Sequence, residues 1–398
     1  RGLRLCDGKD CLTVLDFIGQ ANRHYNFESR FSALLSTTDC SLKKEIENGF
    51  LSLPKGCYVQ LEKKAMEHIL KNIEASYGNR DVLVLKIKSF LEDTKLPLTL
   101  ANFLEYYHLD AKSIYKFSSF SRLCAQAGQI SNFNEPLEEV ITKALPRFAN
   151  MNSRRWITFL NGILSDLNAI DFEKLEGVQK RMLQMFYMTL FGYGFEDFHS
   201  PKTKENFQLL KASPVMVSEI LSLLKYNYNH IDFLDSKVDI GFDCPLDLYC
   251  TYTRDQILSA MDFLKPNTVR EGVKWLPEKK ADVFFITLNK SDKDYSPSTM
   301  YQDYSISETR FHWQSQSTTS EKSAVGQRYI HHKEMGSKIL LFVREFKRDR
   351  YGNVQAYTFL GTANYVSHEG SRPMSIIWEL NAPIPAKYLK KTNKLMGS

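Results

Sequence analysis

Long apolar runs are absent from this sequence of 398 residues. A membrane-spanning helix needs about 20 consecutive, mostly apolar residues, and no stretch approaches that length, so we expect no membrane span. No secretory signal peptide is visible either. With 43% hydrophobic and 25% charged residues, the composition is that of globular domains, and the length allows two or three of them.

Closely spaced cysteine pairs are also absent. The seven cysteines share no repeated spacing and stand at positions 6, 11, 40, 57, 124, 244 and 250. Disulfide frameworks and zinc sites need ligands paired at short spacing, so neither is expected. The pattern predicts structural thiols in a reducing cytoplasm.

Signatures of a self-sufficient ATPase or nuclease are missing as well. The chain contains neither a G-x-x-x-x-G-K-[ST] phosphate loop nor a D-E-x-H box, so we expect no ATP hydrolysis by this chain alone and no cofactor or metal in it. Asp282 and Lys290 lack the second carboxylate of a nuclease site, because Leu288 stands two residues before the lysine. His331 and His332 lack a surrounding metal-binding pattern, and we expect these polar residues to lie on the surface.

Charge is unevenly distributed along the chain. The net charge is +6, but residues 265–398 hold 21 Lys and Arg against 13 Asp and Glu, a balance of +8, which leaves −2 for the preceding part. A basic C-terminal third is compatible with binding of a polyanion such as DNA.

Hydrophobic periodicity predicts a change of secondary structure near residue 240. Between residues 79 and 235 the apolar residues recur with helical spacing, so we expect a helical domain there. Residues 236–270 read as a helical transition, in which Thr253 and Gln256 have the spacing of a capping box. Residues 271–390 carry short β-type runs with no helical run between them, which is typical of a small antiparallel barrel or sandwich.

The expected strands are short and joined by turns. A tight reversal is predicted at Gly352 and Asn353. The expected strands cover residues 283–288, 305–314, 339–346, 356–360 and 375–380.

One segment of the helical part has the outline of a helix-turn-helix. Residues 98–124 could form two short helices joined at Leu109 and Asp110. The second half offers only Lys112, Lys116 and Arg122 for DNA contacts. Two interpretations are therefore open: a DNA-reading helix, or an ordinary pair of packed helices. The small number of cations favours the packed pair.

The densest unusual stretch spans residues 295–320, where aromatic and hydrogen-bonding side chains are interleaved. On a strand, Phe311 and Trp313 would share one face with Ser315, and a row of Arg, His and Gln side chains would share the other. Gln and Arg can bond to base edges, and Trp or His can stack on a base. The alternative is that the aromatic residues are core and the polar row pairs across the sheet.

We predict nucleic-acid binding by this row, with phosphate contacts from basic and amide side chains further along the chain. The predicted residues are Tyr301, Arg310, His312, Trp313, Gln314 and Gln316, followed for phosphate by Gln327, Arg328, Arg348 and Arg372.

The opening residues, RGLRLCDGKDCLTVLDFIG, resemble the end of a superfamily II helicase motor, which has a Q-x-x-G-R-G-x-R motif, a basic spacer and a strand ending in Asp-Phe. Arg1 and Arg4 match the two arginines of that motif. The resemblance implies that both act catalytically on the γ-phosphate of ATP, held with Mg²⁺, but only in an intact motor. We therefore expect residues 1–20 to end a second RecA-like domain, residues 21–78 to be a connector, and the chain to be the back end of a larger protein.

Further motifs appear as YTRDQIL, REGVKW, FFITLNK, ISETRFHWQSQSTTS, LLFVRE, FLG and SRPMSIIWEL, in that order. Together they resemble an uncharacterised C-terminal domain family of bacterial DEAD/DEAH-type helicases, which often carry a phospholipase-D-like nuclease. The resemblance implies a restriction or phage-defence context, with DNA and the parent's motor and nuclease domains as partners. It also implies a barrel similar in outline to base-reading PUA or SRA modules.

The predicted fold class is thus multidomain α+β, with a remnant of a RecA-like domain, an all-α middle and a C-terminal antiparallel β-barrel or sandwich. The predicted function is DNA binding that couples recognition to the motor. The alternative is a scaffold that docks a nuclease or an oligomer partner without contacting nucleic acid.

Overall fold

The computed structural model describes residues 80–389, except positions 108, 170, 196, 270–271, 290–302, 350 and 386–387, together with scattered residues before position 80. Contacts divide the chain into two compact units. The first comprises residues 1–79 and 104–109, within which the rings of Phe31 and Phe50 lie 5.4 Å apart. The second comprises residues 80–103 and 110–398, and the fold described below is that of this second unit, apart from residues 104–106, which belong to the first.

Helices occupy the part of the chain before residue 230, as expected from the apolar periodicity. The helices are α4 (Arg80–Thr94), α5 (Leu100–Tyr106), α6 (Ala111–Tyr115), α7 (Phe120–Gln126), α8 (Glu138–Phe148), α9 (Arg154–Ser165), α10 (Gly177–Phe191), α11 (Pro201–Lys211) and α12 (Pro214–Asn229), with a short 3-10 helix η1 (Phe172–Lys174).

Distant carboxylates hold several helix starts in place. The first N–H groups of a helix have no partner within the helix, and the helix dipole favours a negative charge there. Glu219 of α12 is buried and accepts the backbone N–H groups of Phe120 and Ser121 at 2.6 and 2.9 Å, at the start of α7. Glu135, shortly before α8, accepts two N–H groups of the first turn of α12 at 2.7 and 2.9 Å. These bonds fix the helices relative to one another.

The segment expected to contain a helix-turn-helix forms parts of three short helices, α5, α6 and α7. Arg122 of α7 bonds to Glu138 at 2.5 and 2.6 Å, and Lys112 of α6 lies 3.3 Å from Asp349. Two of the three cations counted for DNA contacts are therefore engaged in ion pairs, which favours the packed-helix interpretation.

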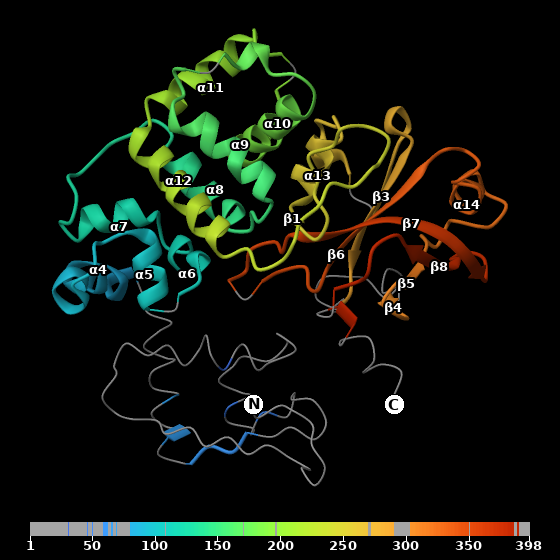
Figure 1. Cartoon of the computed structure of the whole chain (residues 1–398), viewed down its shortest axis with the longest axis horizontal. Coiled ribbons are helices and arrows are strands. Elements are labelled where there is room, and N and C mark those ends of the chain that lie inside the picture. The colour runs from blue at the N-terminus through green and yellow to red at the C-terminus, as the bar shows by residue number, and fades with distance from the viewer. Residues whose placement is uncertain are drawn as a thin grey trace. The chain divides into compact units, whose positions relative to one another are not determined.

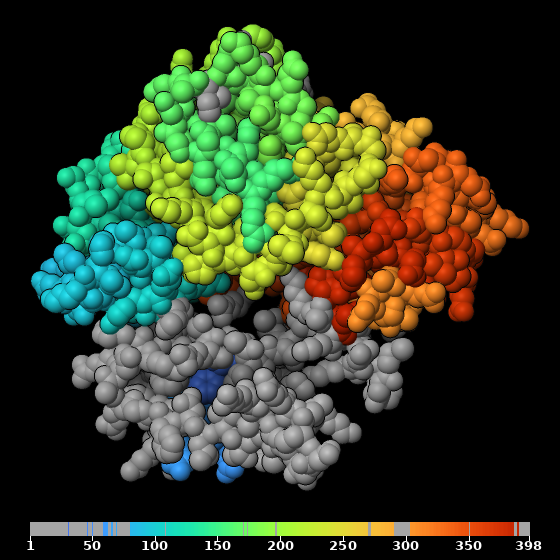
Figure 2. Space-filling view, viewed as in Figure 1, coloured from blue at the N-terminus to red at the C-terminus, as the bar shows by residue number. Residues whose placement is uncertain are grey.

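A buried carboxylate joins the helices to the strand-rich part of the chain. Asp247 accepts from the Ser153 hydroxyl at the start of α9 and from Arg155, both at 2.7 Å, and its own N–H donates to the Tyr252 hydroxyl at 2.8 Å. In Figure 1, α13 (Arg254–Ala260) lies between the helical group and the sheet. The yellow segment of Figure 2 fills the same space between the green helices and the orange-to-red strands.

The capping box predicted at the start of α13 is confirmed. The Thr253 hydroxyl accepts the Gln256 N–H at 3.3 Å, and the Gln256 side chain accepts the Thr253 N–H at 2.8 Å. The helix ends at Ala260.

The strands on either side of α13 form an eight-stranded mixed sheet. The seven strands after α13 have the order β2-β3-β6-β7-β8-β5-β4, and β1, which precedes α13, pairs with β7. Only β3 and β6 pair in parallel; the other recorded pairs are antiparallel. The elements are β1 (Thr251–Tyr252), η2 (Pro266–Thr268), β2 (Val273–Leu276), η3 (Pro277–Lys279), β3 (Ala281–Thr287), β4 (Tyr304–Ser305), β5 (Arg310–Gln314), α14 (Ala324–Ile330), β6 (Lys338–Arg344), β7 (Tyr357–Glu369) and β8 (Ser375–Leu380).

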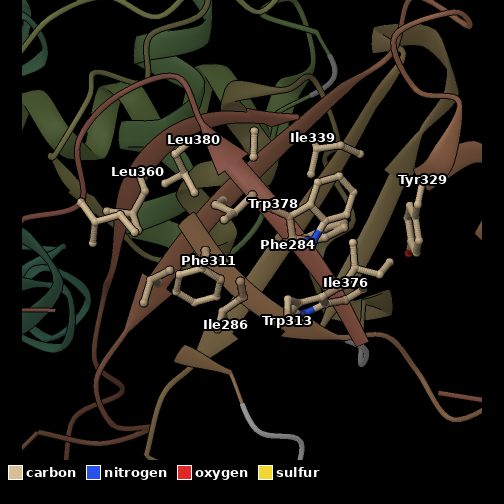
Figure 3. Close-up of a cluster of buried hydrophobic side chains, with 14 of the residues drawn as sticks. Phe284, Ile286, Phe311, Trp313, Tyr329, Ile339, Leu360, Ile376, Trp378 and Leu380 are labelled. Atoms are coloured by element: carbon tan, nitrogen blue, oxygen red, sulfur yellow. The ribbon is translucent and has the colours of Figure 1, made fainter. Parts of the chain in front are cut away.

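The sheet is strongly curled. Phe284 on β3 and Trp313 on β5 stack with ring centroids 4.2 Å apart, although three strands separate β3 from β5 and a flat sheet would hold them about 19 Å apart. The concave face is filled by a hydrophobic cluster that includes Trp378, Ile376 and Tyr329 of α14 (Figure 3). Two register shifts, one on each side of β7, bend that strand and account for the curl.

The expected barrel or sandwich is thus wrong in detail, because the sheet is open: no strand pair closes β4 onto β2 among the described residues. The prediction of an entirely antiparallel sheet is wrong at β3 and β6, which pair in parallel. Parallel neighbours need a long crossover connection, and here that connection contains β4, β5 and α14. The prediction that this region contains no helix is therefore wrong as well. The division of the chain at residues 79, 235 and 270 stays a prediction.

Two polar residues expected at the surface are buried. Asp282 is 0% exposed and receives two hydrogen bonds from Arg328, at 2.8 and 2.9 Å. The His332 ring contacts the Ser337 carbonyl at 3.2 Å and accepts the Tyr365 N–H at 3.1 Å, and burial lowers its pKa. Both expectations fail because each group has found partners in a distant segment.

Within the described residues, no single helix has the length and apolar character of a membrane span; α11 and α12, bent by 82° at their junction, reach those limits only when taken together. Three cysteines in the described part, Cys124, Cys244 and Cys250, are buried and free. Burial raises the pKa of Cys124 and Cys244 to about 12, so their thiols stay protonated and unreactive.

Candidate nucleic-acid interface

The alternation predicted for the unusual polar stretch is confirmed on β5. Phe311 and Trp313 are buried, whereas Arg310 is exposed and His312 and Gln314 are partly exposed. Successive side chains of a strand point to opposite faces, so the three polar residues share the face that is turned away from the core cluster.

Neighbouring strands extend this face into three cross-strand rows, which we name the open face. All its residues are at least partly exposed, whereas β3, nearly all of β6 and the first half of β7 are buried on both faces. The rows are Arg310, Glu379 and Asn364; Tyr304, His312, Ile377 and Ser367; and Gln314, Ser375 and Glu369.

The first row is an ion pair. Arg310 donates from Nε to Glu379 at 3.0 Å, and hydrogen bonds from Thr309 and Arg310 lower the pKa of Glu379. Glu369 adds a second carboxylate at the opposite end of the open face. Because these two carboxylates offset the single arginine, the face itself attracts phosphate weakly.

The middle row holds a ring pair. Tyr304 on β4 stacks on His312 of β5 with a centroid distance of 4.6 Å and an interplanar angle of 16°. Parallel rings at a partly exposed site can extend a stack onto a third flat group. Tyr304 was not among the predicted residues, since the sequence does not show which strand lies beside β5.

The third row brings amide and hydroxyl groups together beside a turn. The Gln314 side chain donates to the Ser375 hydroxyl at 3.3 Å. The backbone beyond it is fixed, because Ser315 N–H donates to the Met374 carbonyl at 2.9 Å and the Met374 N–H donates to the Ser315 hydroxyl at 2.8 Å. The exposed Arg372 lies in the same turn and donates its N–H to the Thr319 carbonyl at 3.1 Å.

Gln316, also predicted, follows Gln314 at the strand's end and is partly exposed. The structure therefore brings five predicted residues to one part of the sheet: Arg310, His312, Gln314, Gln316 and Arg372.

Trp313 lies apart from them, in the core. Only 5% of its surface is exposed, and its ring contacts Phe284, Tyr329 and Trp378 (Figure 3). A base could not stack on this ring without opening the cluster. For Trp313 the geometry favours the structural alternative.

Gln327 and Arg328 belong to α14. Gln327 is exposed and donates to the Glu321 carbonyl at 2.9 Å. Arg328 donates Nε and a terminal nitrogen to the buried Asp282, and its guanidinium carbon lies 4.4 Å from the centre of the Trp275 ring. This guanidinium is occupied by its carboxylate and its ring, so a phosphate contact would have to compete with both.

Arg348 lies in the turn between β6 and β7, where a terminal nitrogen donates to the Gly352 carbonyl at 2.8 Å. Gly352 has a φ of +83°, which fits the predicted reversal at this position. Three remaining predicted residues, Arg1, Arg4 and Tyr301, lie outside the described residues. Among the described residues no group of three His, Cys, Asp or Glu side chains could hold a metal ion.

Residues 246–391 match the family described as "Domain of unknown function (DUF3427)". The matched segment contains every strand of the sheet and therefore the whole open face. It is similar to an uncharacterised domain family, as the order of motifs predicted. No curated protein matches the chain.

Proposed function

We propose that the sheet segment similar to this domain of unknown function recognises nucleic acid through its open face. We further propose that the chain is the C-terminal accessory region of a DNA helicase or restriction-type defence ATPase and couples recognition to the motor. The observation that carries the first proposal is the set of Gln, His, Arg, Asn and Ser side chains collected on one exposed side of the sheet. A merely solvated face would favour Lys, Glu and Thr.

The motor association rests on the opening residues and on the order of motifs. Arg1 and Arg4 match the final helicase motif. This chain contains no phosphate loop, so ATP and Mg²⁺ would bind only in the intact parent protein. DNA and the parent's motor and nuclease domains are the proposed partners.

The open face suits hydrogen bonding to bases better than neutralisation of phosphates. The bond between Gln314 and Ser375 is long at 3.3 Å, so the amide can exchange it for a base edge at little cost. The Tyr304 and His312 rings offer a stacking surface. Arg372, in the adjacent turn, is exposed and could make a phosphate contact.

The small number of cations at the open face predicts a weak dependence of DNA binding on salt concentration. Each neutralised phosphate contributes about 0.9 to the slope of log K against log salt concentration on duplex DNA. With Arg372 and at most Arg310 available, the slope should lie between about −1 and −2.

The test measures fluorescence anisotropy of labelled single-stranded, duplex and modified DNA with the full chain, at about 50 and about 200 mM salt. Gln314→Ala should weaken binding at least about 5-fold, because a two-pronged base contact corresponds to about 1–3 kcal/mol. Gln208→Ala, which removes an exposed Gln on α11, is the matched control and should leave affinity unchanged. Affinity within twofold of wild type in Gln314→Ala, with an intact fold, would overturn the proposed face.

The balanced charge of the open face supports a second candidate, the docking of a protein partner. Arg310 is already paired with Glu379, and the apolar Ile377 lies in the middle of the face. A photo-crosslinking residue at position 312 in the intact parent would separate the two functions. Crosslinks to DNA favour recognition of nucleic acid, and crosslinks to a nuclease or a second copy favour docking.

A further inference from the structure

The open face is broad and convex. It spans four neighbouring strands in the order β7-β8-β5-β4. Neighbouring strands lie about 4.8 Å apart, so the middle row, from Ser367 on β7 to Tyr304 on β4, extends over about 14 Å. Because the core cluster fills the concave side of the curled sheet, the side chains of the open face diverge toward their tips.

The width of this surface excludes close contact with the bases of a duplex. The major groove of B-DNA is about 12 Å wide and admits one helix or a two-stranded ribbon, and the minor groove is about 6 Å wide. A surface of four strands with diverging side chains enters neither groove, so its middle row cannot reach a base edge there. The bases of a single strand do not lie at the bottom of a groove, and their pairing edges are available as well.

The distance between the rows also favours a single strand. Arg310, His312 and Gln314 are two residues apart along β5, which separates their rows by about 7 Å. Bases stacked in a duplex strand are only about 3.4 Å apart, so successive stacked bases would not coincide with successive rows. The nucleotides of an unstacked strand can spread to this distance and place one base at each row.

The cations of the open face suit the two ends of a short strand. Its middle row contains no lysine, arginine or carboxylate. Arg310 stands at the start of β5. Arg372 lies near the other end of β5, since it is two residues before Met374, whose carbonyl accepts the N–H of Ser315. Both arginines are exposed, so a strand laid along β5 would meet a cation near each end and uncharged groups between them.

Each row offers groups that a base can contact. In the middle row the Tyr304 and His312 rings are parallel with their centroids 4.6 Å apart, and a base can continue such a stack because it is flat as well. The third row presents the Gln314 amide and the Ser375 hydroxyl, which both donate and accept hydrogen bonds. The first row presents the Asn364 amide, which has the same two capacities.

We propose that the open face binds single-stranded DNA, laid along β5 with one unstacked base at each row. The middle base joins the stack of Tyr304 and His312, the bases on either side of it bond to the amides of the outer rows, and the outer phosphates meet Arg310 and Arg372. The inference rests on the proposed function of the open face, and it specifies which form of DNA that face recognises.

The test measures the Kd of the full chain for labelled ligands of equal length by fluorescence anisotropy, at about 50 mM salt. The ligands are a DNA strand of mixed sequence, the same strand in a duplex, and a strand that keeps every phosphate but lacks its bases. We expect the strand with bases to bind at least about 10-fold more tightly than either of the others, because one stacked base accounts for about 5- to 150-fold in affinity.

Tyr304→Leu tests the stack. Tyr304 is partly exposed on a short edge strand, and leucine keeps apolar bulk but removes the flat ring. The substitution should weaken the strand with bases at least about 5-fold and leave the Kd of the abasic strand unchanged, since that strand has no base to stack. A merely structural effect would weaken both strands alike. Tyr228→Leu, which replaces an exposed tyrosine on α12, is the matched control and should change neither Kd.

Three results would overturn the inference: the duplex binds as tightly as the single strand, the abasic strand binds within about twofold of the strand with bases, or folded Tyr304→Leu weakens both strands equally. If Tyr304→Leu does not fold, the first two comparisons decide. Loss of duplex binding in Gln314→Ala, without a preference of the wild type for the single strand, would support the open face and refute only the single-stranded form of its ligand. Absence of binding to any DNA would refute both.

Discussion

The ion pair between Arg328 and Asp282 should control the stability of the sheet. Asp282 on β3 is fully buried, and Arg328 on α14 bonds to both of its oxygens while its guanidinium lies over the Trp275 ring. Arg328→Met would leave a carboxylate in the interior without a cation. Breaking a buried pair in this way costs about 3–5 kcal/mol of unfolding free energy at neutral pH, which corresponds to a fall in Tm of about 6–20 °C.

The loss should depend on pH. Desolvation raises the pKa of Asp282 and the bonds and charge of Arg328 lower it, so removing Arg328 raises this pKa further. A carboxyl group whose pKa is higher in the folded than in the unfolded chain makes folding less favourable as pH rises between the two values. The destabilisation is therefore complete above the folded-state pKa and shrinks as pH falls toward the unfolded value of about 3.9.

Urea denaturation followed by tryptophan fluorescence, at about pH 7.5 and about pH 5, measures both effects. The double variant Arg328→Met with Asp282→Asn should recover most of the loss, because no uncompensated charge remains. A loss below about 1 kcal/mol at the higher pH would refute the reasoning. Equal losses at both pH values without recovery in the double variant would refute it too.

Other substitutions test the core and the backbone by the same denaturation assay. Trp313→Ala removes a buried ring and should cost about 3–5 kcal/mol; a cost below about 1 kcal/mol would contradict its place in the core. Glu219→Ala leaves the N–H groups of Phe120 and Ser121 without their acceptor and should cost about 2–4 kcal/mol. Gly326→Ala puts a Cβ 2.1 Å from the Ser320 carbonyl oxygen and should cost about 1–3 kcal/mol. Gly162→Ala in α9 meets nothing within 4 Å and should instead gain about 0.4–1 kcal/mol.

Features that depend on neighbouring residues could be predicted from the sequence. The capping box of Thr253 and Gln256 needs only residues three apart, and the alternation on β5 needs only the strand period of two. The strand predicted over residues 356–360 was too short, because the residues after Leu360 include Gly361 and several polar side chains. They continue the strand to Glu369 since β8 pairs with them there.

Features that depend on distant residues could not be predicted. Asp282 and Arg328 are 46 positions apart, and Glu219 meets the start of α7 across 99 positions. Without these contacts each residue reads as an ordinary surface charge. The same limit applies to the sheet, because the parallel pairing of β3 with β6 and the curl at β7 depend on which strands become neighbours.

The candidate site also has features that the sequence predicts and features that depend on distant residues. The sequence places Arg310, His312 and Gln314 on one face, but only the strand order shows that Glu379 and Tyr304 lie beside them. These two neighbours alter the expected chemistry. The carboxylate offsets the arginine, and the ring supplies a stacking surface.

The position of Trp313 restricts how the open face could work. The Trp313 ring stacks on Phe284 and fills the core on the concave face of the sheet. A ring buried in this way cannot also stack on a base. Any base stacking must therefore come from the opposite side of β5, where His312 already lies parallel to Tyr304. Because strand alternation separates these two sets of side chains, substitutions at His312 should alter binding with little effect on stability, whereas substitutions at Trp313 should alter binding only through unfolding.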